Sequence, residues 1–305
     1  MANQSTVTEF LLMGFSDAHD MQILYFAMFL VIYLLALIGN FLLGVALILN
    51  QNLHAPMYFF LVNLSFSDVC FISTTIPKAM ATSLTNNREI SYVGCAAQVF
   101  SVFTFGGSEL ALLTVMAYDR YVAICHPLQY TLMMNWDACL QMAGASWIST
   151  LIDALLQTIL TFRLNFCKSN IIEQFFCDVP HLLVISCTDT RINHILILVI
   201  GITADSFCSG FIFISYGYIF SAVLKIPSVQ GRYKAFSTCI PHMTVFSLFL
   251  ISALFANLRP QSLSSHTWDL LSAVIYTVFP PLLNPLIYSF RNKDIQKAVW
   301  RMLIT

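Results

Sequence analysis

The feature that most constrains this chain is an uncharged stretch near its beginning. From Met21 to Gln51 the sequence contains no Asp, Glu, Lys or Arg, and most of its residues are apolar. An α-helix rises 1.5 Å per residue, so about 20 apolar residues cross the roughly 30 Å hydrocarbon core of a membrane. The stretch is longer than that, and it predicts a first membrane span at residues 23–49.

Six further apolar stretches follow, at residues 57–82, 93–118, 138–162, 194–224, 235–258 and 269–290. Only 10% of all residues are charged, whereas a soluble domain carries about 25%. This composition excludes a soluble enzyme, and it excludes a disordered chain, which has too little apolar content rather than too much. The net charge of −1 does not suit a nucleic-acid-binding protein, which shows a basic patch. The sequence predicts an all-α membrane protein, a seven-transmembrane helix bundle forming a single domain over residues 1–305.

The distribution of charge orients the spans. With the N-terminal segment (residues 1–22) outside, the cytoplasmic loops and tail hold more basic than acidic residues, and the outer loops hold the reverse. Basic residues near span ends favour the cytoplasmic side. We expect no signal peptide, because residues 1–20 lack its basic and apolar parts. We therefore expect an extracellular N-terminus, with a glycosylation sequence at Asn3, and a cytoplasmic tail at residues 291–305.

The cysteines give the same orientation independently. Cys167, Cys177 and Cys187 lie in the long loop between the fourth and fifth spans, and Cys95 opens the third span. The helix from Cys95 to Arg120 is about 37 Å long, a full membrane crossing. Cys95 therefore lies on the same side as the loop cysteines, as expected for an oxidising outer compartment. Four cysteines allow three pairings, and their spacing does not choose among them.

The tail predicts a short amphipathic helix after Arg291. Apolar residues at helical spacing lie on one face and basic residues on the other, as in a helix at a membrane interface. The apolar set is Ile295, Val299, Met302 and Leu303, and the basic set is Lys293, Lys297 and Arg301.

Catalytic signatures are missing from the sequence. It contains no HExxH, CxxC or GxSxG pattern and no Gly-rich phosphate-binding loop. Its seven histidines show no paired metal-ligand spacing. We therefore expect that the protein is not an enzyme.

Four motifs at span ends carry the most specific information. Residues 116–130 read MAYDRYVAICHPLQY, residues 53–61 read LHAPMYFFL, residues 234–239 read KAFSTC, and residues 281–292 read PLLNPLIYSFRN. In their order and spacing they resemble the vertebrate olfactory (odorant) receptors, within the rhodopsin-like G-protein-coupled receptors. The resemblance extends over nearly the whole chain.

The resemblance implies a plasma-membrane receptor with two outer disulfides, Cys95–Cys177 and Cys167–Cys187. It also implies a set of residues for activation and G-protein coupling, which are Asp119, Arg120, Tyr121, Asn284, Pro285 and Tyr288. Arg120 can pair with Asp119 at rest or offer its donor fork to a docked helix, although an arginine that only anchors a helix end is the alternative. Pro285 weakens the seventh helix beside the Asn284 amide, which gives either a bistable segment or a static kink.

Four acidic residues lie inside the spans, where an unpartnered charge is costly. The resemblance places Asp68 and Glu109 at the sodium-type pocket of the family, so a sodium ion is the one cofactor to consider. The alternative is a network of protonated carboxyl groups. For Asp153 and Asp205 the sequence identifies no partner.

The ligand site is predicted from small residues beside aromatic ones in the outer halves of the third, fifth and sixth helices. Its candidates are Val102, Phe103, Gly106, Gly107, Ile200, Ala204, Ala253, Leu254, Asn257 and Thr277, with Thr104 and Ser108 as further hydrogen-bonding groups. Such a lining suits a small apolar guest. Because no counter-ion is evident at this level, we expect a neutral volatile molecule. Gly106 and Gly107 alternatively mark a close contact between helices.

The function that follows from the resemblance is odorant reception. A small molecule binds in the bundle and shifts its conformation. A stimulatory heterotrimeric G protein responds to this change and raises cyclic AMP. Membrane lipid is the other expected partner. A receptor of the same architecture for a lipid or peptide is the first alternative. A small transporter is the second, but the inverted repeats expected of one are not visible.

The chain departs from the family pattern at three positions. Gln174 replaces a usual His in the long loop, Pro241 replaces a usual Ser, and Leu250 replaces a usual Tyr. The last two lie on the sixth helix, which moves on activation in the resemblance. The activity without agonist is therefore the property that these two replacements bear on, and the sequence does not tell whether they alter it.

Overall fold

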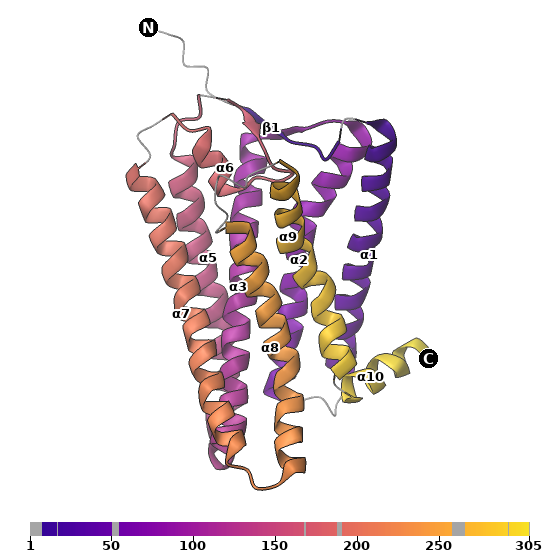
Figure 1. Ribbon diagram of the computed structural model, residues 1–305, viewed down its shortest axis with the longest axis vertical. Coiled ribbons are helices and arrows are strands. Elements are labelled where there is room, and N and C mark those ends of the chain that lie inside the picture. Colours follow the sequence, from indigo (N-terminus) through magenta and orange to yellow (C-terminus); the bar gives the residue numbers. More distant parts are fainter. Residues whose placement is uncertain are drawn as a thin grey trace.

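The computed structural model describes residues 8–16, 18–50, 55–167, 169–187, 191–257, 266–291 and 293–304. Within them, seven helices are long and apolar enough to cross a membrane. They stand side by side in one bundle (Figure 1). The predicted seven-helix fold is confirmed.

The long helices are α1 (His19–Leu49), α2 (Pro56–Thr85), α3 (Tyr92–Cys125), α5 (Trp136–Phe162), α7 (Arg191–Leu224), α8 (Val229–Asn257) and α9 (His266–Arg291). The shorter ones are a 3-10 turn (Pro127–Gln129), α4 (Tyr130–Met133), α6 (Val179–Val184) and α10 (Lys293–Ile304). Several long helices run past the predicted spans. The apolar pattern marks only the part inside the hydrocarbon, whereas the hydrogen-bonded helix continues into the interface.

Local sequence explains where several helices begin and end. The side chain of Ser91 caps α3 by accepting a hydrogen bond from the amide of Gly94 at 3.1 Å. Asn135 caps α5 through the amide of Ala138 at 2.8 Å. Short polar side chains satisfy the free amides of a first helical turn in this way. At the other end of α2, Asn86 stops the helix in a left-handed conformation, with a φ of 53°.

A small sheet covers one end of the bundle. Its strands are β1 (Glu9–Leu12), β2 (Glu89–Ser91) and β3 (Ile171–Ile172), in the order β2-β1-β3. β1 is antiparallel to β2 and parallel to β3. We call this end the sheet end, and the opposite end of the bundle the Arg120 end (Figure 1).

The sheet was not predicted. Phe10 and Leu12 of β1 are buried, and the Phe10 ring packs edge-on against Phe166 with the ring centroids 5.3 Å apart. The strands have two to four residues each, which is too short for an alternating pattern to stand out. Beneath the sheet, the disulfides Cys95–Cys177 and Cys167–Cys187 join the long loop to α3 and to itself.

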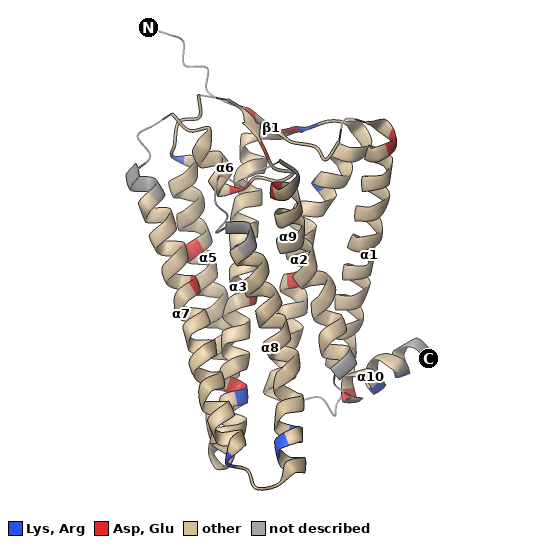
Figure 2. Cartoon of the chain, in the orientation of Figure 1, with Lys and Arg blue, Asp and Glu red and all other residues tan. Residues whose placement is uncertain are grey.

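The centre of the bundle is formed by α3, which contacts α2, α5, α7 and α8. The largest buried cluster lies along its lower half and includes Leu113, Met116 and Phe246. Charged residues gather toward the two ends, with a few acidic residues inside the bundle (Figure 2).

The predicted tail helix is confirmed as α10. Ile295 is buried, and Val299 and Met302 pack against the large cluster, whereas Lys297 and Arg301 are exposed. The predicted apolar face therefore lies against the bundle. The side chains of Lys293 and Leu303 lie outside the described residues.

Candidate functional site

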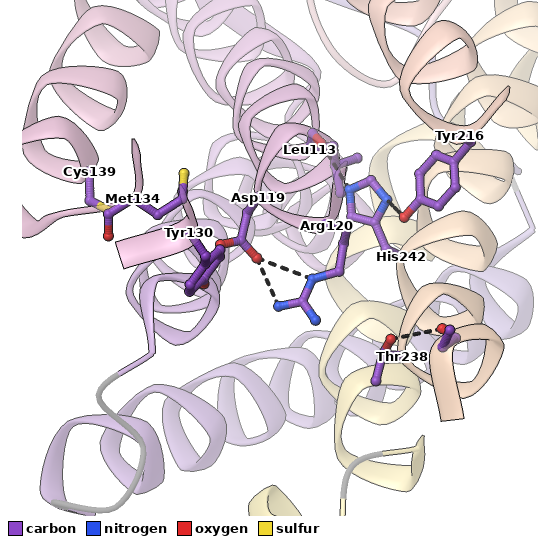
Figure 3. Close-up of polar contacts among 10 residues, drawn as sticks. Leu113, Asp119, Arg120, Tyr130, Met134, Cys139, Tyr216, Thr238 and His242 are labelled. Atoms are coloured by element: carbon purple, nitrogen blue, oxygen red, sulfur yellow. Dashed lines mark hydrogen bonds and ion pairs between the residues drawn. The ribbon is translucent and has the colours of Figure 1, made fainter. Parts of the chain in front are cut away.

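The Arg120 end contains a compact set of polar contacts at the last turns of α3 (Figure 3). The Nε and Nη2 atoms of Arg120 donate to Oδ2 of Asp119 at 3.1 and 2.8 Å. The Asp119 side chain is fully buried. The pair forms between neighbours in the sequence, so the arginine is held by its own helix and not by another one. Such a contact can be exchanged for a contact to a partner without unfolding any element.

Tyr130, the first residue of α4, also contacts Asp119. Its hydroxyl donates to the other carboxylate oxygen, Oδ1, at 2.8 Å. Partial burial, and then the nearby Asp119 carboxylate, raise the pKa of the Tyr130 hydroxyl well above its usual value. The tyrosine therefore stays a neutral donor. Both Asp119 oxygens are engaged, one by the guanidinium and one by the loop that follows α3.

A buried histidine ties α8 to the centre of the bundle. His242 lies 2.9 Å from the backbone carbonyl of Leu113 on α3 through Nε2, and 2.8 Å from the Tyr216 hydroxyl on α7 through Nδ1 (Figure 3). A carbonyl only accepts, so Nε2 carries a proton, and when that is the only ring proton Nδ1 accepts from the Tyr216 hydroxyl. A neutral imidazole thus links three helices. No sequence pattern indicates this role, because the partners are far apart along the chain.

Tyr288, near the end of α9, faces the same region. It is almost fully buried, and among the described residues its hydroxyl has no hydrogen-bond partner. The hydroxyl interacts electrostatically with Tyr216 and Arg120. An unpartnered buried hydroxyl costs free energy. A rearrangement that moved α9 or α8 could give this hydroxyl a partner.

Pro285 lies between Asn284 and Tyr288 on α9, and α1 passes close to it. A side-chain carbon at Gly39 would lie 3.1 Å from the Pro285 ring. The Asn40 amide donates to the carbonyl of Pro281 at 2.7 Å. A side chain of α1 thus satisfies a carbonyl in the proline-containing part of α9, as such segments require.

A second polar site lies deeper, between α2, α3 and α9. The Nδ2 atom of Asn284 lies 3.2 and 3.0 Å from the two Asp68 oxygens and 2.9 Å from Oε1 of Glu109. All three side chains are almost fully buried. The structure thus brings together the two acids that the resemblance groups and adds Asn284 as their common donor.

This second site has more acceptors than donors. One amide nitrogen serves three carboxyl oxygens, while Oε2 of Glu109 and Oδ1 of Asn284 have no partner among the described residues. Buried polar atoms are normally satisfied. Two protons or a cation would supply what is missing, and oxygen atoms are the ligands that hard cations prefer.

The predicted ligand residues are spread over several surroundings. A side-chain carbon at Gly106 would lie 3.0 Å from the Tyr276 hydroxyl, and one at Gly107 would lie 3.3 Å from Thr150. Both glycines therefore allow α9 and α5 to approach α3 closely. Thr277 is buried and donates to the Ala273 carbonyl on its own helix.

The remaining pocket candidates lie on three helices. Val102 packs against a buried cluster that contains Phe175 and Phe176 of the long loop, and Phe103 packs against the cluster around the disulfides. Ala204 on α7 and Leu254 on α8 are exposed, while Ile200 and Ala253 are half-buried. Asn3 and the Asn257 side chain lie outside the described residues.

Gln174, one of the departures from the family pattern, holds the long loop to α9. Its Nε2 donates to the backbone carbonyl of Asp269 at 3.3 Å, and its Oε1 accepts from the amide of Phe175 at 3.3 Å. Gln174 is itself buried. The amide therefore supplies loop hydrogen bonds at the position where the family usually has a histidine.

Comparison with known proteins adds to this geometry. A sequence model described as olfactory receptor matches residues 29–305. The chain is similar to human Olfactory receptor 14A16, with 48% identity over 99% of this chain and 98% of that protein. It is likewise similar to human Olfactory receptor 14I1, with 49% identity over 100% and 98%. The fold is similar to squid rhodopsin, with a TM-score of 0.71 at 18% identity, covering 94% of this chain and 86% of that one.

Proposed function

The chain belongs to the olfactory receptor family, and we propose that it binds a small volatile molecule within the bundle and activates a stimulatory heterotrimeric G protein, which raises cyclic AMP. It is a multi-pass membrane receptor and not an enzyme. The apolar lining that the sequence predicts favours an uncharged body for the ligand.

We place the sheet end outside the cell and the Arg120 end in the cytoplasm. The two disulfides lie at the sheet end, which suits an oxidising compartment. Lys297 and Arg301 on α10 lie at the other end, exposed toward the membrane interface, where they can meet lipid headgroups. The N-terminal segment, including Asn3, is then extracellular.

The observation that carries the proposal is the arrangement around Arg120. The guanidinium is bound by its own neighbour Asp119, while His242 holds α8 against α3 and α7. A ligand that favoured a conformation with α8 moved away would break the contacts of a neutral histidine, which cost about 1 kcal/mol each. Arg120 would then be accessible to a partner from the cytoplasm. Ligand and G protein would be coupled through one two-state bundle.

The deep polar site supports a sodium ion as part of the resting state. Asp68 and Glu109 supply carboxyl oxygens, and Asn284 has an unpartnered carbonyl oxygen beside them. A cation there would tie α9 to α2 and α3. Release of the ion would free the segment of α9 that leads to Tyr288.

A ligand screen with a cyclic AMP readout tests the proposal. Cells that express the wild-type chain should respond to some members of a panel of volatile compounds. Arg120→Ala should reach the cell surface and still bind the agonist, but its cyclic AMP response should disappear. Arg232→Ala, at a basic residue in the first turn of α8, is the matched control and should keep the response.

The outcome also separates the alternatives. A transporter would give no agonist-dependent cyclic AMP signal in any variant. A receptor for a peptide would respond to peptides and not to volatiles. Full signalling by Arg120→Ala at a normal surface density would contradict the mechanism.

A further inference from the structure

A groove between α7 and α8 takes no part in the sites described above. Its volume is about 410 Å³, within the range of about 300–1,000 Å³ that is typical of small-molecule sites. From α7 the ring of Phe220 lines it. The rest of its wall is one face of α8, on which side chains three or four residues apart follow one another, among them Phe236, Ile240, Met243, Ser247 and Ile251.

The groove exists because α8 packs closely against α9 but only loosely against α7. Aromatic rings close its lower end. The rings of Phe220 and Phe236 lie 5.7 Å apart between their centroids, and the Tyr216 ring lies 6.3 Å from that of Phe220. Cys239 is buried at the base of the groove. The space is therefore bounded on α7, on α8 and at its lower end.

The open side of the groove faces the hydrocarbon of the membrane. Ile240, Thr244 and Ile251 are exposed along it, and all three lie within the sixth predicted span. The Thr244 hydroxyl donates to the Ile240 carbonyl of its own helix at 2.8 Å, so it needs no partner from the groove. The occupant at this level is therefore apolar, because water is absent from the hydrocarbon core.

The length of the groove suits a hydrocarbon chain. From Phe236 to Ile251 the helix rises about 22 Å, whereas one leaflet contributes about 15 Å to the hydrocarbon core. The groove thus extends through the whole leaflet at the Arg120 end. A lipid of that leaflet can place one acyl chain along α8 while its headgroup stays at the interface.

The lower end of the groove meets a basic part of the chain. Lys225 directly follows α7, and Lys234 precedes Phe236 by two residues; both lysines are exposed. A basic segment is visible on the lower part of α8 (Figure 2). Residues 206–268 contain no Asp or Glu. Lysine side chains are long enough to reach the headgroup level, and anionic headgroups attract basic residues near the membrane surface.

We propose that this groove is a binding site for an anionic phospholipid, with one acyl chain along α8 and the phosphate at Lys225 and Lys234. The groove fixes where the lipid binds, and the charge complementarity selects the anionic lipid. The site lies beside the tie from His242 to Tyr216, because the Tyr216 ring contacts Phe220. The inference goes beyond the proposed function, since the lipid binds without an odorant.

Photolabelling tests the site. The purified full chain is reconstituted in phosphatidylcholine bilayers with a trace of phosphatidylglycerol that carries a photoactivatable group in one acyl chain. A phosphatidylcholine probe with the same chains is the matched control. Mass spectrometry should locate the label on α8 between Phe236 and Ile251. The anionic probe should label this segment about tenfold more than the control, because each lysine contributes a factor of about five.

Substitutions on the groove wall separate the groove from the general lipid surface. Thr244→Trp places a large ring in the groove and should reduce labelling of α8 by either probe several-fold. Ile214→Trp is the control, because Ile214 is an exposed residue of α7 outside the groove lining. This control variant should keep the wild-type labelling.

Substitutions at the basic end test the selectivity. Lys225→Gln and Lys234→Gln should each lower the ratio of anionic to zwitterionic labelling about fivefold. Lys297→Gln removes an exposed lysine of α10 at the same end of the bundle and should leave the ratio unchanged. Size-exclusion chromatography of each variant checks that it is folded.

Two results would overturn the inference. Equal labelling of α8 by the two probes would show an unselective contact with lipid, and label spread evenly over the outer faces of the long helices would show that the groove holds no lipid. If Thr244→Trp does not fold, the comparison of the two probes on the wild type and the lysine variants decides. The odorant response is measured separately, so its presence or absence leaves these outcomes unchanged.

Discussion

The two ends of the bundle are closed by different kinds of interaction. At the sheet end, two disulfides, backbone pairing between three strands and the buried Phe10 ring hold the loops in place. At the Arg120 end no disulfide or strand pairing joins the described residues, and the helices are held by the large apolar cluster and by side-chain contacts of Arg120, Asp119, Tyr130, Tyr216 and His242. Breaking the first end requires breaking covalent bonds, whereas each polar contact at the second is worth about 1 kcal/mol, or about 1.5–3 kcal/mol where the Asp119 carboxylate takes part. If the bundle opens as proposed, we therefore expect the Arg120 end to open and the sheet end to stay closed.

Removing a disulfide should have the largest effect. Cys95–Cys177 closes a separation of 82 residues and Cys167–Cys187 one of 20. Chain-entropy arithmetic gives about 4–5 kcal/mol for the larger loop and about 3 kcal/mol for the smaller. Cys95→Ser should therefore abolish surface expression, and Cys167→Ser should reduce it.

A cysteine at the Arg120 end provides the control for this comparison. Cys125 is a free, half-buried cysteine at the last residue of α3, and Cys125→Ser should reach the surface at nearly the wild-type level. Surface staining of intact cells measures all three variants. A normal surface level for Cys95→Ser would show that the sheet end does not depend on its disulfides.

Asp68 and Glu109 lie between the two ends of the bundle. Substituting them tests whether this site couples ligand binding to the conformation of the Arg120 end. If Asp68 and Glu109 hold sodium, replacing external sodium with a large organic cation should raise the agonist sensitivity of the wild type. An effect of about tenfold corresponds to about 1.4 kcal/mol. Asp68→Asn and Glu109→Gln should each remove most of this sodium dependence.

Dose–response curves at two sodium concentrations measure the effect. Asp20→Asn, at an exposed acid in the first turn of α1, should keep the dependence. Equal sodium dependence in the wild type and in both buried variants would show that the carboxyl groups form only a protonated network.

The two ends also differ in how far the sequence predicts them. The Asp119–Arg120 contact joins neighbours, so a local motif is enough to identify it. The tie from His242 to the Leu113 carbonyl spans 129 residues, and no local pattern states that two such residues meet. The sheet at the other end has strands of two to four residues, below the length at which periodicity is informative. The seven spans were predictable because about 20 consecutive apolar residues constitute a signal by themselves.

The same limit applies to the acids. Asp153 and Asp205 are visible in the sequence as unusual residues, yet the sequence gives no partner for either. Contacts between α5 and α7, such as that of Gln157 with the Ile197 carbonyl, depend on how the two helices pack, which is a property of the assembled bundle. The neutral ligand was predicted because no counter-ion is evident at the level of the predicted pocket, and it stays a prediction.

Removing one hydroxyl at the Arg120 end should have a smaller effect than removing a disulfide. Tyr216→Phe deletes the donor to His242 and keeps the ring, so the tie between α7 and α8 weakens by about 1 kcal/mol. If this contact favours the resting state, the fraction of open receptor should rise about fivefold. Basal cyclic AMP per surface receptor should rise accordingly.

Tyr218 offers a matched control on the same helix, because it is 61% exposed. Tyr218→Phe should leave the basal signal unchanged. Comparing both variants with the wild type, each normalised to surface density, measures the contribution of the buried tie. Equal basal signals in the wild type and in Tyr216→Phe would mean that the tie does not restrain α8.

The smallest effect is expected from a titrating histidine at the sheet end. Nδ1 of His181 on α6 lies 3.4 Å from the Asp178 carboxylate. Burial alone would lower the pKa of His181, but Asp178 and, more weakly, Asp269 and Glu173 raise it above the usual value. A histidine whose pKa is higher in the folded protein binds its proton more tightly there than in the unfolded chain. Its stabilising contribution is therefore complete below about pH 6.5 and is lost as the pH rises through the raised value.

Thermal unfolding of the purified receptor at pH 6 and pH 8 tests this last contribution. A partly exposed pair contributes less than about 1 kcal/mol, so the unfolding temperature should fall by about 2 °C between the two pH values on account of this group. His181→Gln should remove that part of the difference, while His19→Gln, at the exposed start of α1, should keep it. Even a positive result would leave the sheet end dominated by its disulfides, because the histidine modulates a closure that covalent bonds already secure. An identical pH difference in His181→Gln and the wild type would assign the sheet end's pH response to other groups.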